Sequence, residues 1–508
     1  MNEIKKDYYD VVLVSPPSRM INHYRPPMAL VYLAGYLQRM GMKVKIIDVP
    51  MKNVIRNEEF YKNIENELKT IEDQMVNEFQ SIETKIVGIT FYTPEFFEVF
   101  NLARRFKKCN PDLQVIVGGI HPTFYPEEIF EEKDCPIDFA IIGEGEMTLH
   151  ELAKAILENR KNYPDVKGIA YLDKTSNQMI KTQIRPVEDD LDRISFPAYN
   201  LIDMEYYTNA SPYAIRGCFL RSMYVIATRG CPSQCTFCVA KKLRQYNGGG
   251  KSTRIRSAQK LIEEIRELKD RYKIDSFYFI DDLFTINREN VIKFCKGLKE
   301  SKIDILWGCS SKVSTLNEEI IKHMAEAGCI QIDFGVERGS NEALNIVKKG
   351  ITVEKIEEIF GYCAKYKIRT FANFIINIPG ETKKDLVDIL KFIKKLNPDI
   401  VSINIFTPYP GAEIYDNSKY KFKKEEYPIL TNAAELICMD PKRLRFSEHN
   451  VDFLKFASKY NKKYNKIGTN LKFYLSWRYW KILLKSKNKL NYIKQFKLLI
   501  AEFINQKF

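Results

Sequence analysis

Apolar positions in the first 150 residues alternate between short runs and longer amphipathic stretches. The short runs are rich in Val and Ile and predict buried strands at residues 10–17, 43–48, 85–90, 113–119 and 137–146. Residues 28–41, "MALVYLAGYLQRMG", carry apolar positions at helical spacing and end at a glycine. Strands that alternate with helices predict a doubly wound parallel sheet of the α/β class.

The predicted strand ends of this sheet carry glycines and polar residues. Ligands of open α/β sheets bind at the carboxyl ends of the strands. The glycines would let a ligand approach the backbone, or they simply make turns. The candidate ligand-binding residues at this edge are Pro17, Thr90, Gly118, Gly119, His121, Gly143, Glu144 and Gly145.

A second alternating series follows a stretch of weak periodicity. Residues 161–222 are rich in prolines, acids and turn formers, and we expect a linker there. Further strands are predicted at residues 223–228, 276–281, 303–309, 330–336, 369–377 and 399–406, with helical patterns between them. Six strands with crossover helices predict an open, partial (β/α)6 barrel over residues 223–410, whose chemistry would lie at the carboxyl ends of its strands.

Three cysteines lie in the loop that follows the first strand of this second series. Cys231, Cys235 and Cys238 form a CxxxCxxC motif with no fourth ligand nearby. Thiolates bind zinc and iron–sulfur clusters. Three of them can hold three irons of a cubane and leave the fourth iron open to a substrate or cofactor. A zinc site completed by a distant residue, or buried structural cysteines, are the alternatives.

With the aromatic Phe237 before the last cysteine, the loop resembles the signature of radical S-adenosylmethionine (SAM) enzymes. The segments "FIDDLF", "FGVERGS", "VKKG" and "FIINIPGET" resemble later motifs of the branch that carries an N-terminal cobalamin-binding domain. That branch includes the anaerobic Mg-protoporphyrin monomethyl ester cyclase and cobalamin-dependent radical SAM methyltransferases. The resemblance implies a 4Fe-4S cluster on the three cysteines whose open iron binds SAM, so that one electron cleaves SAM to a 5′-deoxyadenosyl radical.

The resemblance also implies roles for residues at the later strand ends. Phe237 would shield the cluster from water. Asp281 and Asp282 would face the SAM amino group, and Glu337 would lie near its polar groups. The segment from Asn377 to Gly380 would pass close to the adenine. The alternatives are that the aspartates cap the following helix, and that Glu337 pairs with a neighbouring cation.

The N-terminal half resembles the cobalamin-binding module of the same branch. The resemblance lies in "VVLVSPP", "VIVGGIHPTFYPEEIF" and "FAIIGEGEMTLHEL". The DxHxxG motif, whose histidine coordinates cobalt in better-known cobalamin folds, is absent from the sequence, so the lower axial ligand stays unassigned. For His121 we expect a loop or cofactor-edge role. The predicted domains are therefore a cobalamin-binding Rossmann-like domain (1–160), a linker (161–222), a radical SAM barrel (223–410) and a helical C-terminal region (411–508).

Composition and charge add one feature to this organisation. The chain has 508 residues, of which 45% are apolar and 28% charged, and its 11 scattered cysteines favour a reducing, cytoplasmic location. Residues 442–508 contain 17 Lys and Arg against 3 Asp and Glu, interleaved with aromatics, and so carry the whole net charge of +14. This basic region is a helical cap on the body of the protein, a contact with a membrane surface, or a nucleic-acid contact.

The sequence thus predicts a cobalamin-dependent radical SAM enzyme that transfers a methyl group to an unactivated carbon or phosphorus centre. Its substrate would be a small or lipid-like molecule, and flavodoxin or ferredoxin would supply electrons. The alternatives are cyclisation or rearrangement without net methylation, and a zinc- and nucleic-acid-binding protein. An RNA methylthiotransferase would need cysteines for a second cluster in the N-terminal domain, where only Cys109 and Cys135 lie. No acid or base catalyst is identified.

Overall fold

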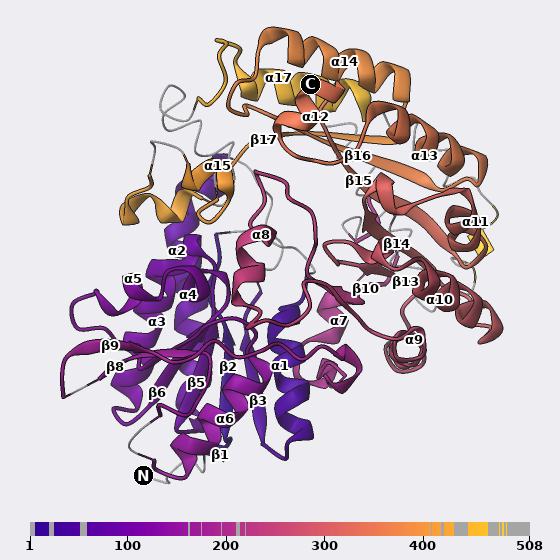
Figure 1. Ribbon diagram of the computed structural model, residues 1–508. Helices are drawn as coiled ribbons and strands as arrows, with labels where there is room; N and C mark the ends of the chain where they lie inside the picture. The colour runs from indigo at the N-terminus through magenta and orange to yellow at the C-terminus, as the bar shows by residue number, and fades with distance from the viewer. Residues whose placement is uncertain are drawn as a thin grey trace.

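The first sheet has seven strands in the order β3-β2-β5-β6-β7-β8-β9 (Figure 1). Its first five strands are parallel, and β8 and β9 are antiparallel. The strands are β2 (Val11–Ser15), β3 (Val44–Asp48), β5 (Ile86–Thr90), β6 (Gln114–Gly118), β7 (Phe139–Ile141), β8 (Ile169–Asp173) and β9 (Gln178–Lys181). Helices α1 (Met28–Arg39) and α6 (Glu146–Leu157) pack together, as do α2 (Glu58–Gln80) and α3 (Phe96–Cys109). This arrangement confirms the predicted α/β class.

The computed structural model describes most of the chain. The described residues are 6–19, 25–50, 58–160, 163–173, 175–194, 196–209, 214–218, 220–407, 409–417, 421–430 and 445–465, with positions 477, 480, 481 and 484. Within them, no helix has the length and apolar character needed to cross a bilayer. Most of the predicted basic helical tail lies outside the described residues.

The segment predicted as a linker, 161–222, instead contributes two strands to the first sheet. β8 pairs with β7, and β9 pairs with β8, through a hairpin whose short, partly polar strands give a weak hydrophobic period. Described residues near Tyr199 contact α1 on one side and α9 on the other. The Tyr199 hydroxyl donates to the Glu264 carboxylate (2.6 Å), and the backbone N–H of Ala198 donates to the Val31 carbonyl (2.9 Å).

The second sheet is all parallel, with its six strands in sequence order. They are β10 (Ser222–Val225), β13 (Ser276–Phe279), β14 (Leu306–Ser311), β15 (Cys329–Glu337), β16 (Arg369–Ile376) and β17 (Ile400–Ile405). The crossover helices cover its outer face (Figure 1): α9 (Ala258–Tyr272), α10 (Arg288–Glu300), α11 (Glu318–Glu326), α13 (Val353–Lys365) and α14 (Lys383–Leu396). The sheet is the predicted partial barrel.

Polar residues fix where the crossover helices of the barrel begin. Each N-cap side chain accepts a hydrogen bond from the backbone N–H three residues further along, which satisfies a donor that the helix cannot satisfy itself. The five N-cap residues are Ser257, Asn287, Asn317, Thr352 and Thr382. The chain therefore leaves each strand and enters its helix at a defined point, and the strand ends are left to form a site.

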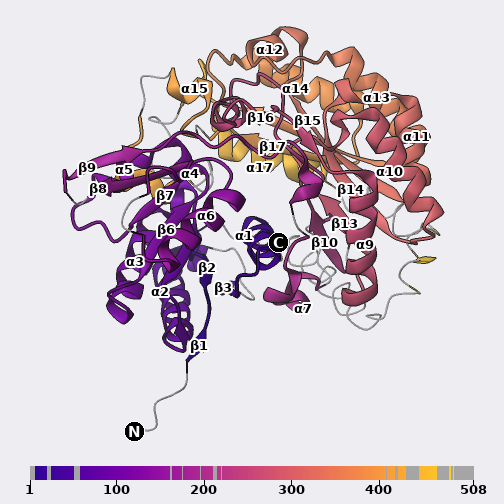
Figure 2. The ribbon, with the colours of Figure 1, turned by 60° about the horizontal axis from the view of Figure 1, so that its bottom comes forward.

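Helix α1 joins the two sheets, and Figure 2 shows it between the first sheet and β10. Its Tyr32 hydroxyl lies 3.4 Å from the Ile226 carbonyl, at the end of β10, and accepts from the Arg256 guanidinium (3.1 Å). Arg256 also pairs with the buried Glu264 carboxylate at 2.5 Å. The buried apolar residues of both sheets form one continuous core, so the two sheets pack as one body.

A helix covers the last edge of the barrel. The side chains of Asn461 and Asn465, at the end of α17 (Phe453–Tyr464), bond the backbone of β17. Asn461 accepts from the Ile403 N–H (2.8 Å) and donates to the Ile403 carbonyl (3.1 Å). Asn465 does the same to Val401 (2.9 and 2.7 Å). Two carboxamides thereby take the place of a seventh strand.

Candidate active site

The three cysteines lie on a loop framed by a short antiparallel ladder. β11 (Thr228–Arg229) pairs with β12 (Arg254–Ile255), and the loop between them begins at Gly230. A Cβ atom at Gly230 would lie 2.2 Å from the Ser252 carbonyl oxygen, so only glycine fits there. The Thr236 N–H donates to the Val347 carbonyl (3.1 Å), which ties the loop to the barrel.

Cys231, Cys235 and Cys238 all line one cavity of about 460 Å³ at the strand ends of the barrel. Burial raises the pKa of Cys235, and the ammonium groups of Lys349 and Lys312 oppose that shift. Burial likewise raises the pKa of Cys238. Lys349 and Lys312 thus place positive charge beside the three thiols. Such a site suits an anionic iron–sulfur cluster, which binds its cysteines as thiolates.

Among the described residues, no three His, Cys, Asp or Glu side chains are placed to hold a single metal ion. A cubane cluster assigns each cysteine to a different iron, so its sulfur ligands lie further apart than the ligands of one ion. The loop, its shared cavity and its cationic neighbours therefore fit a cluster that needs three thiolates.

Phe237 lies beside the cysteines, as a side chain that shields a cluster from water would. Its side chain lines the cavity and packs against the apolar group of Val347, Ile378 and Phe406. The ammonium of Lys349 lies 5.7 Å from the centre of its ring. The aromatic residue thus connects the cysteine loop to the segment that follows β16.

The neighbours Asp281 and Asp282 have different surroundings. Asp281 is buried, and one carboxylate oxygen accepts from the backbone N–H groups of Ala227 (2.8 Å) and Thr228 (2.5 Å). Burial raises the pKa of Asp281 to about 7, although these hydrogen bonds oppose the shift. Asp282 instead lines the cavity and stays exposed. Asp281 therefore anchors the chain that leads into the cysteine loop, and Asp282 is the aspartate available to a ligand.

Glu337 pairs with a lysine that the sequence analysis did not single out. Its carboxylate accepts from the Lys349 ammonium at 2.7 Å, and both side chains are largely buried. Burial would lower the pKa of Lys349, but Glu337 and the thiols of Cys235 and Cys238 raise it overall. Glu337 has a φ of +67° beside a register shift in β15, a strained backbone of the kind that concentrates at functional sites. The pair places a cation beside the cysteines.

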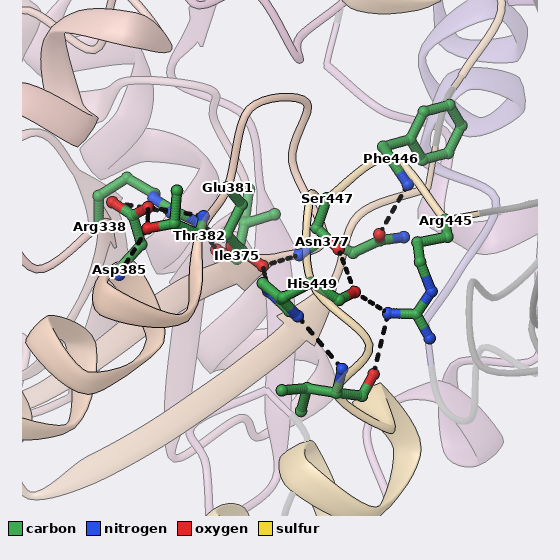
Figure 3. A network of polar contacts seen from close by, with 11 residues as sticks. Arg338, Ile375, Asn377, Glu381, Thr382, Asp385, Arg445, Phe446, Ser447 and His449 are labelled. Carbon is green, nitrogen blue, oxygen red and sulfur yellow. Dashed lines mark hydrogen bonds and ion pairs between the residues drawn. The ribbon is translucent and has the colours of Figure 1, made fainter.

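Asn377 is buried and holds the chain after β16 in place (Figure 3). Its side-chain oxygen accepts from the Phe446 N–H (2.9 Å), and its own N–H donates to the Glu381 carboxylate (2.9 Å). Gly380, three residues on, has a φ of +77° and open space beside its α-carbon. The backbone of this segment is therefore held by hydrogen bonds at Asn377, and the space beside the Gly380 α-carbon is unfilled.

Glu381 is the centre of a buried network with Arg338, Asn377 and His449, here called the Glu381 network (Figure 3). Its carboxylate pairs with the Arg338 guanidinium, which also donates to the Ile375 carbonyl (2.9 Å). His449 Nε2 lies 3.0 Å from the same carboxylate, while its Nδ1 accepts from the Val451 N–H (3.3 Å). This geometry places the histidine proton on Nε2.

The carboxyl ends of β5 and β6 lie side by side in the N-terminal sheet. Thr90 and Gly118 are register partners on β5 and β6, and Pro17 follows β2 and is buried. A Cβ atom at Gly119, whose φ is +109°, would lie 2.8 Å from the Phe91 carbonyl oxygen. The absent side chain there makes room for the protein's own backbone. Tyr92 remains 51% exposed next to it, which leaves an aromatic ring available at this edge.

His121 is fully buried in the short helix α4 (Ile120–Phe124) rather than in a loop. Burial lowers its pKa to about 3, so the ring is neutral. Its Nδ1 lies 3.1 Å from the Thr93 hydroxyl, and its ring packs among aromatic side chains. The imidazole is therefore enclosed by protein atoms.

Gly143, Glu144 and Gly145 follow β7 and contact the barrel and α1. The Glu144 carboxylate pairs with both Arg254 and Arg229, the latter at 3.1 Å. A Cβ at Gly143 would lie 3.2 Å from the Tyr246 carbonyl, and one at Gly145 would lie 3.1 Å from Leu33. These residues thus join the first sheet to the ladder that frames the cysteines.

Among the predicted site residues, the structure brings together Cys231, Cys235, Phe237, Cys238 and Asp282 in one cavity, with Glu337 joined to it through Lys349. The residues predicted at the edge of the first sheet do not line this cavity. Sequence reasoning missed several polar residues that do: Arg25, Arg216, Tyr278, Ser310, Lys312, Asp333, Lys349 and Asn373. Period-two positions on the inner face of the strands would have identified Tyr278, Ser310, Asp333 and Asn373. Nothing local marks Arg25 and Arg216.

Two family models match the chain. The model described as "Radical SAM superfamily" matches residues 225–393, which include the cysteine loop. The model described as "B12 binding domain" matches residues 20–153. The first match covers most of the second sheet, and the second match covers part of the first sheet.

Curated relatives and solved structures align over most of the chain. An uncharacterized methyltransferase of Pyrococcus horikoshii is 32% identical over 80% of this chain and 82% of its own length. The anaerobic magnesium-protoporphyrin IX monomethyl ester cyclase of Rubrivivax gelatinosus is 29% identical over 82% of this chain and 71% of its own. The structure of the radical SAM methyltransferase TsrM from Kitasatospora setae, with cobalamin and a [4Fe-4S] cluster bound, superposes with a TM-score of 0.62 at 18% identity. That superposition covers 80% of this chain and 77% of that one, and it supports the fold.

Proposed function

As a member of the radical SAM superfamily with a B12-binding domain, this chain is a cobalamin-dependent radical SAM enzyme, and we propose that it methylates an unactivated carbon or phosphorus centre. The observation that carries the proposal is the shared cavity of Cys231, Cys235 and Cys238 at the strand ends of a barrel joined to the B12-binding domain. When bound, the cluster and SAM supply radical chemistry and cobalamin supplies a methyl carrier.

The protein's own residues would position and shield these groups. The three thiolates would hold the cluster, and Lys349, kept charged by Glu337, would balance part of its negative charge. Asp281 would keep the cysteine loop at a fixed distance from β10 through the N–H groups of Ala227 and Thr228. Asp282, which lines the cavity, would be available to contact a bound SAM.

For cobalamin we propose the edge formed by β2, β5 and β6, where Thr90, Tyr92 and Gly118 lie. The half-exposed Tyr92 ring offers an apolar face of the kind that a flat macrocycle requires. The network of Glu144 with Arg229 and Arg254 fixes this edge relative to the cysteine loop. His121 is enclosed and neutral, so we propose that it supports the edge and does not coordinate cobalt.

The first test is anaerobic purification with cobalamin supplied, followed by iron, sulfide and cobalt analysis and an optical spectrum. We expect about four irons and one cobalt per chain. Cys235→Ala should lose the cluster, whereas the buried Cys295→Ala, on the outer helix α10, should keep it. Iron without cobalt would overturn the cobalamin assignment. Zinc with neither would overturn the whole proposal and favour a zinc- and nucleic-acid-binding protein.

Cyclisation without net methylation is the second candidate, because a porphyrin-ring cyclase is among the relatives. Product mass separates the two. A gain of one methyl group supports methyl transfer, and a loss of hydrogen or a gain of oxygen supports cyclisation.

We propose flavodoxin or ferredoxin as the electron donor. Turnover with reduced flavodoxin in place of dithionite tests that partner.

For the basic tail we propose contact with an anionic membrane surface. The support is that Trp477, Trp480 and Leu484, spaced by three and four residues, are 73%, 43% and 53% exposed. Vesicles with and without anionic lipid provide the assay. Deletion of residues 471–508 should abolish sedimentation with anionic vesicles, and unchanged sedimentation would overturn this proposal.

A further inference from the structure

The part of the cavity formed by the inner faces of β10, β13 and β15 is lined by cations that the radical chemistry does not explain. Arg25 and Arg216 both line it, with Tyr224 and Asp333. The Arg25 guanidinium lies 5.4 Å from the centre of the Tyr224 ring, and that of Arg216 lies 4.1 Å from the centre of the Phe371 ring. Both arginines are exposed to the cavity and stacked on aromatic faces.

The charges around this part of the cavity do not balance. Asp333 is the one carboxylate among the described lining residues here, and Arg216 Nε lies 3.6 Å from it, beyond hydrogen-bond distance. The guanidinium of a further arginine, Arg369, also interacts electrostatically with the Asp333 carboxylate. Gln331 donates to Asp333 at 2.7 Å, and burial raises the Asp333 pKa. Arg25 makes a side-chain hydrogen bond to Tyr224 and, among the described residues, no ion pair with a carboxylate. The guanidiniums of Arg216 and Arg369 thus both act on Asp333, and Arg25 adds a further positive charge to the cavity wall.

We propose that this part of the cavity, the arginine pocket formed by Arg25, Arg216 and Tyr224, binds an acidic group of the substrate. The substrate is then a small molecule that bears a carboxylate, a phosphate or a phosphonate, and its reacting atom faces the cysteines. This inference rests on the proposed function, because it takes the cavity to be the substrate site.

The geometry of the pocket matches acid recognition. A guanidinium is planar and presents its N–H groups in a fork that pairs with two oxygens of one acid. Contact with the Tyr224 and Phe371 rings holds each guanidinium at the cavity wall. An anion would also offset the cost of keeping like charges close together in a partly desolvated site.

The direction of the pocket follows from the strands. On β13, Tyr278 lies within the strand and Asp282 lies past its end, and both line the cavity. The Tyr278 hydroxyl lies 3.0 Å from the Ser310 hydroxyl, while the cysteines are near Lys312 and Lys349. An acid bound at the arginine pocket would thus extend along the strand direction toward the cluster loop.

Binding of simple aromatic acids to the cluster- and cobalamin-loaded protein, saturated with SAM, tests the proposal. The probes are phenylphosphonate and benzoate, with benzyl alcohol as the neutral control, measured by calorimetry. We expect the acids to bind and the alcohol not to bind. Arg216→Gln and Arg25→Gln should each weaken acid binding by about tenfold or more, as expected when a hydrogen bond to a charged group is lost. The acid that binds with the lower Kd indicates whether the pocket recognises a phosphonate or a carboxylate.

Three further variants separate recognition from general charge. Arg271→Gln removes an exposed guanidinium that lies 5.2 Å from the Tyr272 ring on the outer helix α9, and it should leave binding unchanged. Arg216→Lys keeps the charge but loses the fork and should give intermediate affinity. Asp333→Asn removes the competing carboxylate and should strengthen acid binding.

Two results would overturn the proposal. One is the absence of acid binding to the wild-type protein. The other is binding of the acids by the Arg25→Gln/Arg216→Gln double variant with the same affinity as by the wild type. Iron and cobalt contents are measured on the same samples. A protein that holds both but binds no acid overturns the arginine pocket alone, whereas a protein without cluster or cobalt overturns the proposed function.

Discussion

In the Glu381 network, the Arg338 guanidinium lies against a buried carboxylate and a backbone carbonyl. In the arginine pocket, the Arg25 and Arg216 guanidiniums lie beside a cavity and outnumber the one carboxylate there. The side chains of Arg338 and Glu381 are 3% and 0% exposed, whereas that of Arg216 is 50% exposed. Matched charges in a closed site fix the chain, and unmatched charges at an open site are available to a ligand.

The largest expected difference between the two regions is in stability. Arg338→Met leaves the buried Glu381 carboxylate without its cation and should lower the free energy of unfolding by about 3–5 kcal/mol. Arg216→Met, at a half-exposed position, should lower it by less than about 1 kcal/mol. Urea denaturation of the two variants measures both values. Equal losses would mean that the arginine pocket is also a structural site.

The next largest effect compares Asp281 with its neighbour. Asp281→Ala leaves the Ala227 and Thr228 N–H groups buried without their acceptor and should cost about 2–4 kcal/mol. It should also reduce the iron bound per chain, because the cysteine loop loses its anchor. Asp282→Ala, at the cavity, should change stability little. A stable Asp281→Ala protein with full iron content would show that the loop is held by other contacts.

The pH dependence of Asp281 follows from its raised pKa. With a pKa of about 7 in the folded state and about 3.9 in the unfolded chain, the folded protein binds an extra proton between those values. Stability contributed by this group is therefore present at low pH and falls as pH rises toward about 7. Asp281→Asn, which stays neutral, should not show this fall. Denaturation midpoints of the wild type and of Asp281→Asn, each measured at pH 5 and at pH 7.5, give the difference.

The smallest effect concerns His449. A glutamine there can still donate to Glu381 but cannot accept from the Val451 N–H in the same geometry. His449→Gln should therefore cost about 1 kcal/mol, the value of one hydrogen bond. The matched control is His323→Gln on α11, which should cost less. A loss as large as that of Arg338→Met would mean that His449 holds the Glu381 network through more than these two hydrogen bonds.

Much of the fold follows from sequence patterns because it depends on local periodicity. The runs at residues 85–90 and 113–119 became β5 and β6 because parallel strands buried on both faces need Val and Ile throughout. The strands β8 and β9 escaped prediction because β8 has only three buried residues and β9 has none, so neither gives a long apolar run. The sequence locates the cysteines because one loop holds all three.

The rest of the candidate site depends on contacts between distant segments. Arg25 precedes α1 and Arg216 precedes β10, and only the packing of α1 against the barrel brings them to one cavity. The pairing of Glu337 with Lys349 likewise needs the register shift in β15, which no local pattern announces. Asp281 is buried and Asp282 is exposed although they are neighbours, because Asp281 bonds the distant backbone at Ala227 and Thr228.

The two asparagines that bond β17 have a consequence for how the chain behaves when shortened. An unpaired strand edge is a template for other chains, and the carboxamides of Asn461 and Asn465 occupy the backbone groups that would recruit them. Removing residues 471–508 leaves that cover in place. A truncation that also removes α17 would expose the edge of β17 and favour aggregation.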